Sequence, residues 1–266
     1  MIASGIITLT TDFGLKDAYV AIMKGVILSI NPEARIIDIS HQVNAGSIVN
    51  AASLVEETYR FFPEGAIHVA VVDPGVGGRR RPILFQTENH FFVGPDNGIF
   101  WPIISNLQDV EIINLTEMKY FLPHVSHTFH GRDIFAPVAA HLSRGVDPHE
   151  FGPVNGNIVH LDFPVPQQEG NILSGQVMRV DHFGNIITNI HKNDLERFSV
   201  PEEIVISVES MTVKGIYKTY SEVKGGDTLA LIGSSGYLEI AVNSGRACDL
   251  LKLETEFITG SKVEVS

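Results

Sequence analysis

Short apolar runs alternate with helix-like repeats along the first half of the chain. The run at 66–72 contains IHVAVV and is apolar enough for a parallel strand covered on both faces. The order of patterns predicts strand 5–10, helix 18–30, strand 35–38, helix 48–61, strand 66–72, and strands 83–86 and 90–93. Gly46-Ser47 is a suitable start for the second helix. The alternation predicts an α/β fold with a mostly parallel sheet.

The pattern changes after residue 150. Residues 151–170 are rich in Pro, Gly and Asn, which is typical of a domain boundary, and we place it near Pro164. Beyond it, short apolar segments alternate with turns, including the turns HFGN and SSG. We therefore expect two domains, 1–164 with an α/β fold and 165–266 with a small β-barrel or sandwich.

Composition excludes several classes of protein. The 266 residues are 44% hydrophobic and 19% charged, as in a globular protein, and the formal net charge is −12. Such an acidic balance, with no basic stripe, argues against nucleic acid as a partner. The apolar runs are far shorter than the roughly 20 residues of a membrane span. Cys248 is the single cysteine and the first residues lack the features of a signal peptide, so we expect a cytoplasmic protein.

The first predicted strand runs into Thr11-Asp12-Phe13-Gly14. Ligands of open α/β sheets gather beyond the carboxyl ends of the strands, which makes Asp12 a candidate binding residue. No GxGxxG or GxxxxGK[ST] motif follows, so an acid stands where nucleotide-binding folds cradle phosphate. A carboxylate there suits hydroxyl groups, as on a ribose, or a cation. The alternative is that Asp12 is only a turn or capping residue before the next helix.

Asp73 follows the apolar run at 66–72 and begins the turn-rich stretch DPGVGGRRR. Asp-Pro-Gly is a common turn and by itself indicates no catalysis. Three guanidinium groups follow, Arg79, Arg80 and Arg81, and one of them beside Asp73 would stabilise and orient the carboxylate. For the other two we expect a solvated loop.

A third candidate site is the stretch SHTFHGRD at 126–133, which precedes the helical pattern IFAPVAAHLSRG. A helix start beside Gly131 would expose backbone N–H groups that stabilise negative charge. His130 is the nearby group that titrates near neutrality. His124, His127 and His130 are evenly spaced, which leaves a metal site as the competing hypothesis, although no HExxH motif is present.

Turns of the second half supply further polar and aromatic candidates for a ligand-binding cleft. The turn at 181–185 carries Phe183 and Asn185, and the turn that begins at Gly233 carries Ser235, Tyr237 and Glu239.

Six motifs, TTDFG, FFPEGAIHVAVVDPGVG, VGPDNG, FHGRDIFAP, VDHFGNIITNI and SSGYLEIAVN, together resemble the S-adenosyl-L-methionine (SAM) hydroxide adenosyltransferase family. The resemblance follows the order of the family's motifs over nearly the whole chain. It implies a Rossmann-like α/β domain followed by a C-terminal β-barrel, and a homotrimer with active sites between subunits. The implied activity is hydrolysis of SAM at the ribose 5′ carbon to adenosine and L-methionine, without metal or cofactor.

The same resemblance implies a role for each candidate residue. Asp12 would bind the ribose hydroxyls, and Asp73, Arg80 and His130 would handle water. Arg80 is chosen among the three arginines because its offset from Asp73 fits the family pattern. The residues that would hold adenine and the methionine part are Phe183, Asn185, Ser235, Tyr237, Glu239, Val242 and Asn243, with Asp181 a candidate for the methionine amino group.

Two positions separate this chain from the halogenating relatives that the resemblance includes. Those enzymes carry Tyr in place of Asp73 and a halide-contacting Ser in place of Gly131. A carboxylate repels a halide and accepts a hydrogen bond from water, which favours hydrolysis. A halogenase, a metal-dependent hydrolase and an adenosine- or SAM-binding module without turnover remain the alternatives, and the sequence does not distinguish the two sulfonium epimers of SAM.

Overall fold

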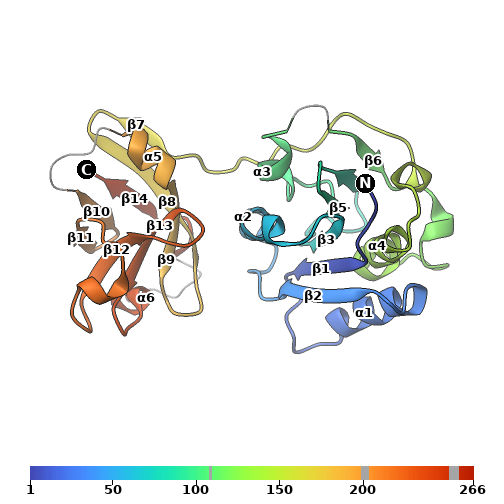
Figure 1. The fold of residues 1–266 in the computed structure, drawn as a ribbon, viewed down its shortest axis with the longest axis horizontal. Coiled ribbons are helices and arrows are strands. Elements are labelled where there is room, and N and C mark those ends of the chain that lie inside the picture. The colour runs from blue at the N-terminus through green and yellow to red at the C-terminus, as the bar shows by residue number, and fades with distance from the viewer. Residues whose placement is uncertain (108–109, 199–203, 252–257) are drawn as a thin grey trace. The chain divides into compact units, whose positions relative to one another are not determined.

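The chain folds, in a computed structural model, into two compact units, Met1–Asp162 and Phe163–Ser266. The structure describes residues 1–107, 110–198, 204–251 and 258–266. Each unit has its own sheet (Figure 1). Buried apolar side chains form separate cores in the two units.

The first unit is built on a six-stranded, mixed sheet of order β2-β1-β3-β5-β4-β6. The strands β2, β1, β3 and β5 are parallel neighbours, whereas β4 runs antiparallel to both β5 and β6. This confirms the predicted α/β class with a mostly parallel sheet. The strands are β1 (Ile6–Thr11), β2 (Arg35–Ser40), β3 (Ala66–Val71), β4 (Pro82–Gln86), β5 (His90–Pro95) and β6 (Ile112–Asn114).

Helices cover both faces of this sheet. The central strand β3 is buried at every position, and its successive side chains enter opposite cores. Ile67, Val69 and Val71 join the core beneath α1 and α4, while Ala70 joins the core beneath α2 and α3. The helices are α1 (Tyr19–Ile30), α2 (Ile48–Thr58), α3 (Trp101–Ile104) and α4 (Ala136–Ser143).

Two helix predictions need correction in detail. The helix expected over 48–61 begins after Ser47, whose side chain accepts a hydrogen bond from the Asn50 N–H, but its α-helical part ends at Thr58 and a 3₁₀ turn follows. The helix expected after Gly131 begins with a π-helical turn, Gly131–Phe135, which precedes α4. This wide turn lies at the candidate site, where π-helical turns are frequent.

The second unit is an antiparallel sheet with the strand order β11-β10-β14-β8-β9-β13-β12, in which β7 also pairs with β8. Residues of β11 approach β12 at the other end of the order, so the sheet is nearly closed into a barrel. This confirms the predicted small β-barrel. The strands are β7 (Gln167–Glu169), β8 (Ile172–Val180), β9 (Ile186–His191), β10 (Val205–Val208), β11 (Met211–Lys214), β12 (Thr228–Ile232), β13 (Tyr237–Val242) and β14 (Lys262–Val265), and the helices are α5 (Lys192–Arg197) and α6 (Ala247–Leu250).

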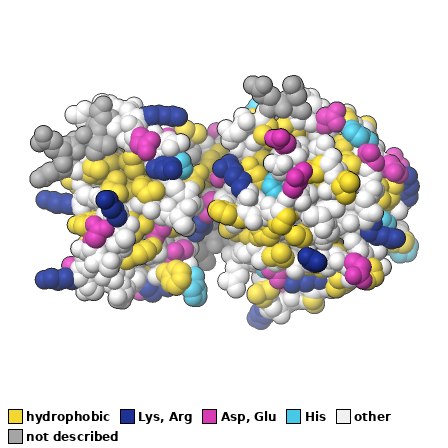
Figure 2. Space-filling view, viewed as in Figure 1, with side chains coloured by type: hydrophobic (Ala, Val, Ile, Leu, Met, Phe, Trp, Pro, Cys, Tyr) yellow, Lys and Arg dark blue, Asp and Glu magenta, His cyan; other side chains and the backbone are white. Residues whose placement is uncertain are grey.

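Charged side chains of both signs are scattered over the face of each unit shown in Figure 2. Among the helices that the structure describes, none is long and apolar enough to cross a membrane.

Candidate active site

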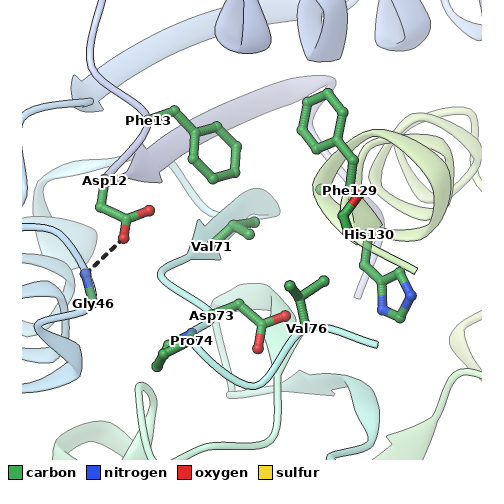
Figure 3. A pocket seen from close by; sticks show the side chains of 11 residues that line it. Asp12, Phe13, Gly46, Val71, Asp73, Pro74, Val76, Phe129 and His130 are labelled. Carbon is green, nitrogen blue, oxygen red and sulfur yellow. Dashed lines mark hydrogen bonds between the residues drawn. The ribbon is translucent and has the colours of Figure 1, made fainter. Parts of the chain in front are cut away.

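Two carboxylates emerge from the same edge of the first sheet. Asp12 directly follows β1, and Asp73 lies two residues beyond the end of β3. The two strands are parallel neighbours with Thr11 paired to Val71, so both acids leave the sheet at its carboxyl edge. They line one cavity of about 240 Å³, together with Phe13, Gly46, Val71, Pro74, Val76, Thr128, Phe129, His130 and Gly131 (Figure 3).

Asp73, Arg80 and His130 form one hydrogen-bonded group. The Nε of Arg80 lies 3.0 and 2.9 Å from the two carboxylate oxygens of Asp73, and an Nη of Arg80 also contacts Asp73 Oδ2. The same Nη donates to Nδ1 of His130 at 2.7 Å. The side chains of Arg80 and Asp73 are only 9% and 5% exposed, so the forked ion pair is shielded from solvent. The structure brings together the three residues that the sequence singled out.

This contact defines the protonation of His130. A guanidinium group has only donors, so Nδ1 of His130 is the acceptor and the proton of the neutral ring lies on Nε2. Burial lowers the pKa of His130, and the positive charge of Arg80 lowers it further. The charges of Asp73 and Asp133 act in the opposite direction but do not overcome this effect. Nε2 is therefore a hydrogen-bond donor at neutral pH.

The loop between Asp73 and Arg80 is made of two consecutive turns. Val76 N–H donates to the Asp73 carbonyl at 3.1 Å, and Gly78 N–H donates to the Gly75 carbonyl at 3.0 Å. Gly77 adopts a φ of +74°, and a Cβ at this position would collide with the carbonyl of His127. Glycine is therefore required both by the backbone angle and by the packing of this loop against the 124–130 segment.

Asp12 is held by its own hydrogen bonds. Its Oδ2 accepts from the N–H of Gly46 at 2.8 Å. The preceding residue, Thr11, is bonded through Oγ1 to Nδ1 of His41 at 2.9 Å, and the other ring nitrogen of His41 lies 3.0 Å from Asp38. His41 is buried and was not singled out from the sequence, because its contacts join segments about 30 residues apart.

Asp133 fixes the segment that carries His130. This carboxylate is fully buried and accepts from the N–H of Ser126 at 2.8 Å and from Nε of Arg132 at 2.5 Å. Arg132 also stacks over the ring of Phe129, 5.2 Å from its centroid. Asp133 belongs to the quoted motif FHGRD but was not proposed as a site residue. The signal that could have found it is the charged pair Arg132-Asp133 directly before the apolar run IFAPVAA.

Aromatic rings form the apolar wall of the cavity. Phe13 and Phe129 meet edge to face with their centroids 5.7 Å apart, and Tyr19 contacts both rings. A second hollow of about 620 Å³ adjoins the first, since Asp12, Phe13, Thr128 and Phe129 line both. These walls are suited to a planar, partly apolar ligand.

The other two arginines differ from each other. Arg79 is exposed, as expected for a solvated loop. Arg81 is not: its guanidinium pairs with the buried carboxylate of Asp96, with Nε 2.9 Å from Oδ2, and also contacts the carbonyl of Asn157. The expectation of a solvated loop is therefore wrong for Arg81, because the buried acid at the end of β5 required a partner.

The histidines of the proposed metal site lie in different environments. His124 and His127 are exposed, whereas His130 is half-buried and bonded to Arg80. Within the described residues, no group of three or more His, Cys, Asp or Glu side chains is arranged to hold a metal ion.

In the second unit, the candidate residues lie at the ends of two hairpins. Asp181 accepts from the N–H of Asn185 at 2.8 Å and from its side-chain amide at 3.0 Å. Between them, Phe183 is 71% exposed. In the other hairpin Ser235 is exposed, and Tyr237 is half-buried at the start of β13.

Further along β13, Glu239 is buried and accepts a hydrogen bond from the hydroxyl of Tyr220 at 2.5 Å. Burial raises the pKa of Glu239, and the nearby charge of Asp181 raises it further, while the bond from Tyr220 acts against both. Val242 is buried, and the amide of Asn243 donates to the Val223 carbonyl at 2.8 Å. Tyr220 was missed because no local pattern links it to a residue on another element.

Fold and site together define a two-unit protein with an α/β unit, a β-barrel unit and an acid–arginine–histidine group at the carboxyl edge of the α/β sheet. Sequence profiles identify the particular group of proteins. The profile of the SAM hydroxide adenosyltransferase N-terminal domain matches residues 7–152, and that of the C-terminal domain matches residues 175–257. The chain belongs to the SAM hydroxide adenosyltransferase family.

Individual relatives agree with this assignment. The chain is 38% identical over 248 residues to an (R)-S-adenosyl-L-methionine hydrolase of Salinispora arenicola, which covers 92% of this chain and 93% of that protein. It is 27% identical over 274 residues to a fluorinase of an Actinoplanes species, covering 90% and 91% of the two chains. The crystal structure of an uncharacterized conserved protein from Thermotoga maritima superposes with a TM-score of 0.89 at 36% identity, covering 97% of this chain and 99% of that one.

Proposed function

We propose that this protein is an enzyme that hydrolyses S-adenosyl-L-methionine to adenosine and L-methionine. The observation that carries the proposal is the Asp73–Arg80–His130 group, of which Asp73 and His130 line a cavity together with Asp12 in a chain of the SAM hydroxide adenosyltransferase family. Relatives named (R)-S-adenosyl-L-methionine hydrolase, at 35–38% identity, favour the (R) sulfonium epimer as the substrate.

In this reaction, a water oxygen forms a bond to the ribose C5′ while the C5′–S bond breaks. The bonding electrons leave on sulfur, so the sulfonium becomes the neutral thioether of methionine. One proton must leave the attacking water. Asp73 lines the cavity and Arg80 orients both of its carboxylate oxygens, so we assign Asp73 as the proton acceptor. The proton then passes to solvent, and adenosine is formed with the water oxygen at its 5′ position.

Arg80 and His130 have supporting roles in this mechanism. Arg80 holds the carboxylate in one orientation through its forked contact. The neutral His130 accepts from Arg80 through Nδ1, which leaves Nε2–H as a donor toward an oxygen that carries developing or residual negative charge. The role of His130 is therefore donation through Nε2, and the proton acceptor is Asp73.

Asp12 and the apolar walls position the substrate. A carboxylate at the end of β1 suits the two ribose hydroxyls, each of which can donate a hydrogen bond to it. Phe13, Val71 and Phe129 would surround the reacting carbon with apolar side chains. Water stabilises a nucleophile and a sulfonium of opposite charge while they are apart, so excluding water lowers the barrier to their reaction. An in-line arrangement of oxygen, C5′ and sulfur adds the benefit of orientation.

The site also explains why hydrolysis is favoured over halogenation. Asp73 places a carboxylate beside the reacting position, where it repels a halide. A side chain at Gly131 would be crowded, since a Cβ there would lie 3.2 Å from the sulfur of Met23 and 3.4 Å from Phe129. The carboxylate at position 73 and the absence of a side-chain hydroxyl at Gly131 both act against the alternative halogenase activity.

Residues of the second unit complete the proposed substrate site. Asp181 is the candidate for the methionine amino group. The candidates for adenine and the methionine part are Phe183, Asn185, Ser235, Tyr237, Glu239, Val242 and Asn243. In the proposed assembly, a homotrimer, these residues come from a neighbouring subunit. Sedimentation equilibrium tests the assembly, because a trimer has three times the 29.1 kDa mass of the chain.

The decisive experiment uses the separate (R) and (S) epimers of SAM in water labelled with ¹⁸O. Hydrolysis as proposed gives adenosine with the label at its 5′ oxygen and unlabelled methionine, with the (R) epimer consumed faster. Parallel reactions with chloride or fluoride detect a halogenated adenosyl product, and dialysis against a chelator detects metal dependence. Recovery of intact SAM from both epimers would identify a binding module instead and contradict the proposal.

A further inference from the structure

Asp96 and Asn97 follow β5 at the same sheet edge as the reactive group. They belong to the motif VGPDNG, and β5 is the parallel neighbour of β3, the strand that leads to Asp73. Neither residue lines the cavity beside Asp73, so the mechanism above does not use them. Their hydrogen bonds nevertheless go to the immediate neighbours of Asp73 and Arg80.

Asn97 holds the residue before Asp73. Its side-chain amide donates to the carbonyl of Val72 at 2.8 Å. Its side-chain oxygen accepts from the N–H of Ile99 at 3.2 Å, which fixes the amide in this orientation. One side chain therefore closes its own turn and, at the same time, anchors the start of the loop that carries Asp73.

Asp96 holds the residue after Arg80. Its carboxylate is 2% exposed and pairs with the guanidinium of Arg81, and its own N–H donates to the Arg81 carbonyl at 2.8 Å. Both the side chain and the backbone of Arg81 are thus fixed to the end of β5. Breaking a buried ion pair on one side leaves an uncompensated charge, so this anchor is strongly maintained.

The loop between the two anchors needs such restraint. Residues 74–79 include three glycines, which retain more backbone freedom than other residues. The carboxylate at one end of this loop and the guanidinium at the other must meet within hydrogen-bond distance. A misplacement of about 1 Å in a catalytic group can lower the rate by roughly 10²-fold.

We propose that Asp96 and Asn97 are positioning residues for the hydrolysis, because they anchor both ends of the 73–80 loop and so hold Asp73 against Arg80. This inference rests on the proposed function of that pair. The two residues act through Val72 and Arg81 and do not touch the substrate.

The test separates the anchoring contact of Asn97 from its turn contact. In Asn97→Ser, the shorter hydroxyl can still accept from the N–H of Ile99 but no longer reaches the Val72 carbonyl. We expect kcat to fall between about 10-fold and 10²-fold while KM stays within about 2-fold. In Arg81→Lys the positive charge remains, but the forked guanidinium contact with Asp96 is lost. We expect kcat of this variant to fall by a smaller factor than kcat of Asn97→Ser. Arg79→Ala, on the exposed arginine of the same loop, is the matched control and keeps wild-type kinetics.

An NMR titration without substrate measures the pKa of His130, which a loss of stability alone would not change. Since the charge of Arg80 contributes to the lowered pKa of His130, a displaced Arg80 raises the pKa of His130 in Asn97→Ser and leaves it unchanged in Arg79→Ala. The spectrum of His130→Gln assigns the signal. A folded Asn97→Ser protein with wild-type kcat and wild-type titration of His130 would overturn the inference. If the wild type itself does not turn over SAM, the proposed function fails, and the titration alone decides whether Asn97 positions Arg80.

Discussion

The two units carry their candidate residues in different ways. In the first unit, the charged groups are tied to one another and shielded: Asp73 to Arg80, and Arg80 to His130. In the second unit, half of the candidates, Asp181, Phe183, Asn185 and Ser235, lie on hairpin turns, and Phe183 is 71% exposed. The difference separates two physical tasks. Proton acceptance and orientation of water require fixed geometry, whereas recognition of a base tolerates side chains that adjust to the ligand.

Some candidates of the second unit are also held by partners: Asn185 is bonded to Asp181, and the buried Glu239 is bonded to Tyr220. The pKa of Glu239 is raised chiefly by burial, so this acid is built more like the groups of the first unit. The comparison is therefore between side chains that are held by partners within the protein and side chains that are not. It can be tested one residue at a time.

The largest effect is expected from breaking the hydrogen-bonded group of Asp73, Arg80 and His130. Asp73→Asn removes the proposed proton acceptor, and Arg80→Ala removes the group that we propose orients it. Each change should lower kcat by roughly 10²-fold or more. Steady-state kinetics with SAM measure the loss, and calorimetric titration with adenosine should show nearly unchanged affinity, since Asp12 is intact. Wild-type turnover in both variants would contradict the assigned roles.

A smaller effect is expected at the binding acid of the first unit. Asp12→Ala should weaken adenosine binding by about 1–3 kcal/mol, because a charged hydrogen-bond partner of the ribose is lost. Asp12→Asn is the control, since its side-chain oxygen can still accept from the N–H of Gly46. Equal affinities of Asp12→Ala and wild type, measured by calorimetry, would rule out the ribose contact.

Acid should destabilise the first unit through a buried histidine. His68 is bonded to Thr8 and lies against His90, and burial lowers the pKa of His68 from 6.5 to about 3. Below pH 6.5 the unfolded chain therefore binds a proton that the folded chain does not. His68 alone should lower the free energy of unfolding by about 1.4 kcal/mol per pH unit as the pH drops from 6.5 toward 3, and this loss is absent above pH 6.5.

Urea unfolding at pH 7.5, 6 and 5 measures this slope. Trp101 is the single tryptophan of the sequence and lies in the first unit, so its fluorescence reports on that unit. His68→Gln removes the titrating group and should flatten the pH dependence. Equal slopes in the variant and the wild type would exclude His68 as the cause.

The smallest effect is expected at the exposed ring of the second unit. Phe183→Ala should weaken adenosine binding by about 0.5–1.5 kcal/mol through lost aromatic contact. Because the ring is exposed, the free energy of unfolding should change by less than about 0.5 kcal/mol. An unchanged adenosine affinity would remove Phe183 from the proposed site.

The architecture and the positions of the acids could be predicted from the sequence because they depend on local patterns. Continuous apolar runs mark buried strands, and the residue type just beyond each run marks the sheet edge, as at Asp12 and Asp73. The family motifs added the choice of Arg80 among the three arginines and the joint role of Asp73, Arg80 and His130. Their assembly into one hydrogen-bonded group is a structural finding, whereas their roles in turnover stay predictions.

The remaining features depend on partners that are distant in sequence. Arg81 pairs with Asp96, and Tyr220 with Glu239, and in each case the two residues lie on different elements. The tautomer of His130 follows from Arg80, the donor that meets its Nδ1 from 50 residues away in the sequence. A pattern of apolar and polar residues contains no information about such pairings.

The contacts of Asp96 also bear on where this chain can be divided for study. Its Oδ1 accepts from the N–H of Val159 at 2.8 Å, so the stretch around 157–159 belongs structurally to the first unit. An excised fragment that ends at Asp162 keeps this bond, whereas one that ends before Asn157 would leave a buried acceptor without its partner, at about 1–3 kcal/mol. The useful boundary for expressing the α/β unit by itself is therefore set by a single carboxylate oxygen.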